Sequence, residues 1–275
     1  MAKRPKNIMF KTTKQSKGEE TKKFVAILVF CVVAVLAVSI FAIVSGNSKD
    51  DGGVTIVEEQ AEIEVEKTYL FWCADGSELR FAWLVNVEMP ERRAVVCTLD
   101  VNRKLGGGYE ESIRQVFASE GIKKLVADME AEFETQIDGY IGSDEEGFKS
   151  MINYFGGFDI TVPEQITYRS GDFALTLVKG KQNMKGDTLF KYIRYLCTLD
   201  EDGRDLQADA MSEMLACVFK PSNISKCDSI FSRISNTLET DLTIVDYSSA
   251  KSGIEILVEE GFASIRTVDK PEKVK

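Results

Sequence analysis

The pattern of hydrophobic and polar positions is most informative between residues 137 and 163. Apolar side chains recur there at helical spacing and predict one face of a short helix, formed by Phe148, Met151, Ile152 and Phe155. Gly156-Gly157 follows at once, and glycine readily takes the left-handed conformation that ends many helices. Alternation over 158–162 then predicts a strand that Pro163 ends. We expect the apolar helix face to pack on the sheet that contains this strand.

The pattern elsewhere predicts further strands and amphipathic helices. Runs dense in β-branched and aromatic residues, or alternating, predict strands at 68–73, 79–87, 93–99 and 173–178. Apolar residues at helical spacing predict helices near 113–117, 122–133, 187–195, 206–219 and 224–234. Residues 240–243 suggest a helix N-cap with Thr or Asp as the capping side chain, and the polar end at 270–275 is expected to fray. Strands mixed with such helices predict an α/β fold, with helices on both faces of one sheet.

The N-terminal region has the pattern of a membrane anchor. Phe24 to Val44 is a run of 21 residues without a charge, which as a helix would span ~31 Å, enough for a bilayer core. Basic residues precede it, so the positive-inside rule places the N-terminus in the cytoplasm and the rest of the chain outside. A cleaved signal peptide is the alternative, but its apolar core is usually ~7–15 residues.

These boundaries divide the chain into five predicted parts. They are a cytoplasmic basic tail (1–23), a transmembrane helix (24–44), a linker (45–66), an extracellular domain (67–250) and a C-terminal extension (251–275).

Composition narrows the chemistry. The formal charge is −10, but residues 1–45 hold eight basic and two acidic residues, so the remainder carries 26 basic (34 − 8) and 42 acidic (44 − 2) residues. A net charge of −16 opposes nucleic-acid binding, which needs clustered Lys and Arg. The chain has no His, which excludes His-based metal sites and a His general base. Five cysteines follow the apolar run without CxxC spacing, and we interpret them as structural.

Two stretches carry recognisable motifs. In the first, Asp138-Gly139-Tyr140 leads through the predicted helix to a glycine turn and strand, with motif positions at Gly156, Gly157, Asp159, Val162 and Pro163. The second contains Gly180, Gln182, Gly186, Tyr192, Arg194, Glu201, Gly203 and Arg204. Found in this order behind a predicted membrane span, the motifs resemble those of the LytR-CpsA-Psr family. Gly139 replaces the family's His, and Glu201 stands at the family's Asp.

The resemblance implies a three-layer α/β/α sandwich outside the membrane. It implies binding of a polyprenyl-(pyro)phosphate-linked glycan, which is passed as a phosphosugar to peptidoglycan, with the lipid tail in an apolar tunnel. Arg194 and Arg204 are the candidate phosphate ligands, joined by Glu201, because arginine binds phosphate in bidentate fashion and stays charged. Asp75 and Asp100 are candidate ligands of a divalent metal such as Mg²⁺ or Mn²⁺, which would offset negative charge.

The chain departs from the family pattern at sensitive positions. Leu196 replaces a second Arg, Gln207-Ala208 replaces an Arg-Gln pair, and the family's Ser-Ile-Pro-Arg-Asp reads as residues 98–102, Thr-Leu-Asp-Val-Asn. The family's Asp before the second strand falls near Arg80. Most of the phosphate clamp is therefore missing, which favours a lipid-binding pseudoenzyme.

Other interpretations stay open. An active phosphoglycosyl transferase is one, and a membrane-tethered assembly protein without a ligand is another. At the level of residues, Arg194 and Arg204 are also explained by ion pairs with nearby acidic residues at helix ends. Asp75 is also explained by a turn at a strand end.

Overall fold

The computed structural model describes residues 66–105 and 111–274. The predicted tail, the apolar run and nearly all of the linker lie outside the described residues. Within the described ranges, no helix combines the length and the apolar character that a membrane crossing needs.

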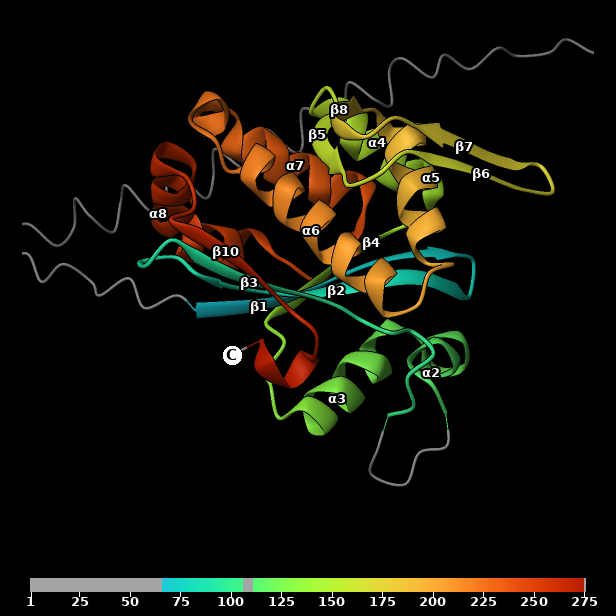
Figure 1. The fold of residues 1–275 in the computed structure, drawn as a ribbon. Helices are drawn as coiled ribbons and strands as arrows, with labels where there is room; N and C mark the ends of the chain where they lie inside the picture. The colour runs from blue at the N-terminus through green and yellow to red at the C-terminus, as the bar shows by residue number, and fades with distance from the viewer. Residues whose placement is uncertain (1–65, 106–110, 275) are drawn as a thin grey trace, which may run out of the picture. The chain divides into compact units, whose positions relative to one another are not determined.

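One mixed sheet organises the described chain (Figure 1). Its strand order is β10-β3-β2-β1-β4-β9. The bounds are β1 Glu66–Asp75, β2 Glu78–Glu88, β3 Arg93–Thr98, β4 Gly139–Ser143, β9 Glu239–Thr240 and β10 Ser264–Val268. The β1–β2, β2–β3 and β4–β9 pairs are antiparallel, whereas β1–β4 and β3–β10 are parallel. The three strands predicted between residues 68 and 99 are confirmed.

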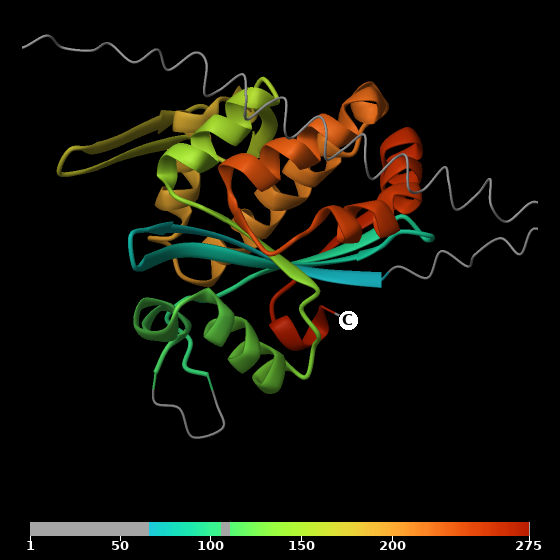
Figure 2. The same cartoon turned by 180° about the vertical axis from the view of Figure 1, so that it is seen from behind.

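Helices cover both faces of this sheet, as the two opposite views show (Figures 1 and 2). One face carries α2 Ile113–Glu120 and α3 Ile122–Phe133. The other carries α4 Glu145–Tyr154, α5 Gly186–Leu196, α6 Glu201–Val218, α7 Cys227–Thr237 and α8 Ile244–Glu260. A short 3-10 helix, Pro221–Lys226, precedes α7. The predicted α/β layering with helices on both faces is confirmed.

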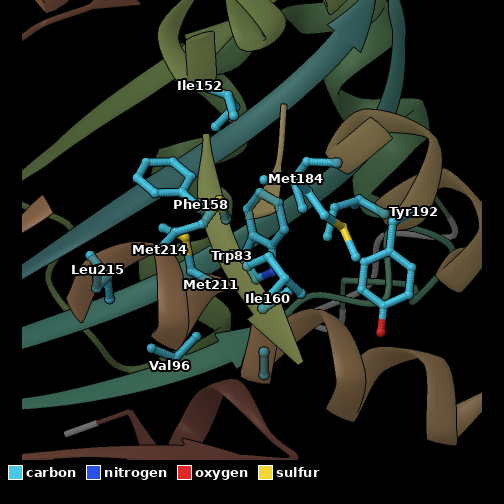
Figure 3. Close-up of a cluster of buried hydrophobic side chains, with 14 of the residues drawn as sticks. Trp83, Val96, Ile152, Phe158, Ile160, Met184, Tyr192, Met211, Met214 and Leu215 are labelled. Carbon is cyan, nitrogen blue, oxygen red and sulfur yellow. The ribbon is translucent and has the colours of Figure 1, made fainter. Parts of the chain in front are cut away.

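Each face of the sheet has its own hydrophobic core because side chains alternate along a strand. On β2, Phe81, Trp83 and Val85 belong to the core under α4–α8, while Ala82 and Leu84 belong to the core over α2 and α3. Figure 3 shows part of the first core, where side chains from β2, β5 and α6 meet. Nearly all of these side chains are buried, so β2 is a central strand with apolar residues on both faces.

The strand at 158–162 is present but not in the central sheet. It forms β5, Phe158–Val162, paired only with β8, Gly180–Met184. A second hairpin joins β6 Ile166–Ser170 to β7 Phe173–Leu177. The Thr161 amide and hydroxyl donate to the Glu213 carboxylate of α6, at 2.8 and 2.5 Å. At Thr161, a helix side chain thus takes the place of a neighbouring strand as hydrogen-bond partner.

The C-terminal region is more ordered than predicted. Residue 250 falls inside α8, and β10 pairs in parallel with β3, so residues 251–274 supply part of the central fold. Fraying of 270–275 is also wrong for the described residues, because Val274 is fully buried in the core over α2 and α3. A single apolar residue near the end of a polar stretch anchors it.

Candidate functional site

A large apolar cavity lies between the central sheet and helices α4, α6, α7 and α8. Its volume is about 290 Å³. Its walls are almost entirely hydrocarbon and aromatic; they include Trp83, Val85, Met151, Phe155, Ile234 and Leu257. A space of this kind excludes ions and favours an apolar ligand.

The apolar face of α4 faces this cavity. Phe148, Met151, Ile152 and Phe155 all line it. Only Ile152 is buried; the other three are half-buried. The predicted face is therefore correct, and its predicted packing on the sheet of β5 is confirmed at Phe155, whose ring centroid lies 5.5 Å from that of Phe158 in the shared core. Part of the α4 face borders the cavity, whose other walls include α7 and α8.

A second, polar pocket lies at the carboxyl end of β3. Its volume is about 210 Å³, and its walls come from β2, the β3–α2 segment, α2, the α5–α6 loop and α6. Three guanidiniums, of Arg80, Arg114 and Arg204, line it together with the carboxylates of Asp100 and Asp200. The charge of these five side chains is +1 (3 − 2), so the pocket suits an anion.

The three guanidiniums differ in what they bind. Arg80 donates from Nη1 to Glu78 at 2.7 Å and from Nη2 to Asp75 at 3.0 Å. Arg204 lies 4.0 Å from Asp100, the limit of an ion pair. In the described part of the chain, the Arg114 side chain has no ion pair or hydrogen bond, and its buried Nε has no acceptor.

Two helix N-termini place Arg114 and Arg204 at the pocket. Arg114 is the second residue of α2, whose start is fixed by a capping box between Ser112 and Gln115. The Arg114 amide also donates to the Val101 carbonyl at 2.9 Å, which ties α2 to the segment after β3. Arg204 is the fourth residue of α6. Amide groups at helix starts favour anions, so both elements add positive potential.

Phe81 lies between the two cavities. Phe81 lines the polar pocket. Its ring centroid is 5.0 Å from that of Trp83 and 5.5 Å from that of Phe148, and both of these side chains line the apolar cavity. One aromatic side chain thus separates a hydrocarbon-lined space from a guanidinium-lined one. This arrangement fits an amphipathic molecule with an anionic head.

The structure brings together only some of the predicted site residues. Arg204 and Asp100 line the polar pocket. Asp75 lies outside it, exposed and paired with Arg80. Glu201 is exposed at the start of α6 and lines neither cavity. Arg194 is exposed and stacks its guanidinium over the Phe173 ring at 5.1 Å, so it does not share a pocket with Arg204 as predicted.

Arg80 and Arg114 are the pocket residues that sequence reasoning missed as anion ligands. Surface arginines are common and carry no local mark of function. The one available signal was position, because Arg114 follows the Ser112 cap directly, and a cation in the first turn of a helix opposes the helix dipole. Arg80 was noted only because it lies near the position of an Asp in the family pattern.

The polar pocket also contains a buried amide and a thiol. Gln207 is buried, and its Oε1 accepts from the Cys197 thiol at 3.6 Å. Although Cys197 as a residue is exposed, burial of its thiol raises the pKa to about 11, against the opposing charges of Arg114 and Arg194. The thiol therefore stays protonated near neutral pH and is a weak nucleophile.

Sequence comparison identifies the family. The model of the LytR_cpsA_psr family matches residues 93–270, more than half of the chain. The chain belongs to the LytR-CpsA-Psr family. The matched stretch runs from β3 through α8 to β10 and includes every residue of the polar pocket except Arg80 and Phe81.

Curated relatives of this LytR-CpsA-Psr protein include cell-wall transferases. It is 27% identical over 146 residues to polyisoprenyl-teichoic acid–peptidoglycan teichoic acid transferase TagV of Bacillus subtilis, covering 50% of this chain and 37% of the relative. It is 23% identical over 178 residues to biofilm regulatory protein A of Streptococcus mutans, covering 58% of this chain and 44% of the relative. The chain therefore spans less than half the length of these curated relatives.

Solved structures share the fold. The crystal structure of TagV from B. subtilis superposes with a TM-score of 0.62 at 20% identity, over 75% of this chain and 84% of that one. A structure of the family protein TagT with bound octaprenyl pyrophosphate superposes with a TM-score of 0.55 at 15% identity, over 81% and 84% of the two chains. At these identities the likeness establishes the fold of this family member.

The metal expectation for this LytR-CpsA-Psr protein does not fit the residues present. Among residues 66–105 and 111–274, no group of three acidic or Cys side chains could hold a metal ion. Asp75 binds Arg80, and Asp100 has Arg204 as its neighbour. Asp75 and Asp100 also do not share a pocket. A divalent cation prefers several oxygen ligands free of competing cations.

Proposed function

We propose that this protein binds a polyprenyl-(pyro)phosphate-linked glycan in the cell envelope, with reduced or lost transfer of that glycan to peptidoglycan. The observation that carries the proposal is that the apolar cavity and the guanidinium-lined pocket lie on either side of one side chain, Phe81. The lipid tail occupies the apolar cavity, and the phosphate lies among the guanidiniums of the polar pocket. The predicted anchor at 24–44 holds this domain outside the membrane.

Burial of the tail supplies most of the affinity. Apolar surface removed from water contributes roughly 25 cal/mol per Å², so each isoprene unit that enters the cavity adds binding free energy. Headgroup binding adds orientation, because guanidiniums recognise phosphate oxygens with directed hydrogen bonds. The solved TagT complex with octaprenyl pyrophosphate and the transferase name of TagV support this class of ligand.

Reduced transfer is supported by two positions that should carry family arginines. Leu196 is fully buried, and Val101 is 7% exposed, so both are apolar side chains packed in the cores. Without arginines at these positions, positive charge is missing where negative charge develops during phosphosugar transfer. Electrostatic stabilisation of that developing charge is usually the largest catalytic effect. The alternative is an active transferase, which Arg114 favours because it adds a guanidinium to the pocket.

Filling the apolar cavity tests the proposal. Ile234 of α7 lines the cavity and is half-buried, so Ile234→Trp should block it; Ile244→Trp, at a side chain 65% exposed outside the cavity, is the control. Binding of a polyprenyl phosphate to the full chain in detergent micelles should fall about tenfold or more in Ile234→Trp only.

Met151→Trp, on the α4 wall, gives a second blocking variant should Ile234→Trp unfold. Equal lipid binding by the native chain and both blocking variants, each with a native-like melting temperature, would overturn the assignment of the cavity. A parallel assay of glycan transfer to peptidoglycan should show slow or absent turnover for the native chain. Fast turnover would establish the active-transferase alternative instead.

A further inference from the structure

We propose that the polar pocket holds the pyrophosphate of the lipid headgroup without a divalent metal, through Arg80, Arg114 and Arg204. This inference rests on the proposed function and states how its site neutralises the headgroup. The pocket is lined by three guanidiniums and two carboxylates. Arginine stays charged at any working pH, so the positive charge is permanent.

As far as the structure describes the chain, the side chain of Arg114 lacks an acceptor that an anion in the pocket would supply. Its side chain has no acceptor among the described residues, and its Nε is buried. A charged donor without a partner is costly to bury, which makes such a group a marker for a missing acceptor. The residue also stands in the first turn of α2, where a cation opposes the helix dipole. An anion in the pocket removes both penalties.

Arg80 explains why the pocket needs no metal. Its guanidinium engages the carboxylates of Glu78 and Asp75 with one hydrogen bond each, at 2.7 and 3.0 Å. Of its five N–H donors, three remain (5 − 2). The side chain therefore engages the carboxylates of Glu78 and Asp75, which do not line the pocket, and keeps N–H donors free for an anion. A divalent cation there would meet three like charges with few free oxygen ligands.

Arg204 completes the set from the opposite layer. Arg114 comes from α2 on one face of the sheet, and Arg204 comes from α6 on the other. Arg204 lies 4.0 Å from Asp100, which is too far for a hydrogen bond to that carboxylate. A diphosphate has enough oxygens to accept from several guanidiniums at once, which a single carboxylate does not.

The test measures binding of polyprenyl pyrophosphate and inorganic pyrophosphate to the full chain in detergent micelles, by isothermal titration calorimetry. Binding of the lipid should persist in excess EDTA, and added Mg²⁺ should not strengthen it. Arg114→Gln should weaken lipid binding about tenfold or more, since it removes charge-assisted hydrogen bonds. The affinity of Arg114→Lys for the lipid should lie between those of the native chain and Arg114→Gln, because lysine keeps the charge but lacks the planar guanidinium.

Arg169→Gln is the matched control. Arg169 is an exposed arginine on β6 outside the pocket, and its substitution should leave binding unchanged. Mn²⁺ titration followed by electron paramagnetic resonance gives an independent readout. The native chain should leave Mn²⁺ in its free form, and stoichiometric binding that Asp100→Asn removes would overturn the inference.

The outcomes separate this inference from the proposed function. Loss of lipid binding in EDTA, or full binding by a folded Arg114→Gln variant, overturns the metal-free clamp while sensitivity to Ile234→Trp keeps the lipid assignment. Inorganic pyrophosphate that binds as tightly as the lipid overturns the headgroup as the source of the anion. Absence of lipid binding by the native chain overturns both proposals.

Discussion

At the residue scale, the two consecutive glycines after α4 have different roles. Gly156 and Gly157 both have positive φ, of 83° and 90°. A Cβ on Gly156 would meet nothing within 4 Å, whereas one on Gly157 would lie 2.8 Å from the Met184 carbonyl oxygen and 2.7 Å from Asn183 Oδ1. Gly156 thus serves backbone conformation alone, and Gly157 also allows β8 to approach.

This difference predicts unequal costs for two matched substitutions. Gly156→Ala should lower the free energy of unfolding by ~1–2 kcal/mol, the cost of a left-handed conformation for a residue with a Cβ. Gly157→Ala should cost clearly more, because the Met184 carbonyl cannot move without disturbing the β5–β8 pair. Urea unfolding of the full-length variants provides the measurement. Equal losses of unfolding free energy in the two variants would show that β8 can shift to accommodate a Cβ at position 157.

At the element scale, local pattern predicted β1 to β3, whose side chains strongly prefer strands. β1 to β3 are dense in aromatic and β-branched residues, and their pattern alone was sufficient. β4 contains two glycines, β8 is largely polar, and β10 is an edge strand with no buried residue. These three depend on partners distant in sequence, such as β3 for β10, so tertiary contacts decide them and periodicity does not.

The start of α8 is an element whose stability depends on pH. Thr243 was within the predicted cap and is the N-cap. The Asp246 carboxylate accepts from the Thr243 amide at 2.7 Å and from its hydroxyl at 2.6 Å. These bonds lower the pKa of Asp246 below its ordinary value. The stabilisation is therefore complete above about pH 4 and is lost as pH falls through the lowered pKa.

Thr243→Ala should cost ~1 kcal/mol near neutral pH, the usual value for a lost cap. The difference from the native chain should shrink at about pH 3, since Asp246 is then becoming protonated in both. Urea unfolding at the two pH values measures it. Thr237→Ala removes a hydroxyl that donates only to the Arg233 carbonyl, so its effect should not vary with pH. A Thr243→Ala cost that is the same at both pH values would show that the bond from the Thr243 hydroxyl to the carboxylate contributes nothing.

At the scale of the whole molecule, the site arises from segments that sequence reasoning treats separately. Of the predicted site residues, Arg204 and Asp100 line the polar pocket, although the sequence paired each of them with a different residue. The apolar face of α4 has the same spacing whether it packs fully or borders a cavity. Whether the α4 face is fully packed or borders a cavity depends on where α7 and α8 lie. The sequence pattern does not specify those positions, so the cavity could not be predicted. Arg80 and Arg114 likewise meet only through the fold.

The central claim is that one amphipathic ligand occupies both cavities, with its tail in the apolar one. The most direct measurement uses a polyprenyl pyrophosphate that carries a diazirine at the far end of its tail, photolysed on the full chain in micelles, with labelled peptides identified by mass spectrometry. We predict saturable labelling on α4, α7 and α8, which excess unlabelled lipid suppresses and Ile234→Trp reduces. Labelling confined to other surfaces, such as the β6–β7 hairpin, or labelling that does not saturate, would contradict the account.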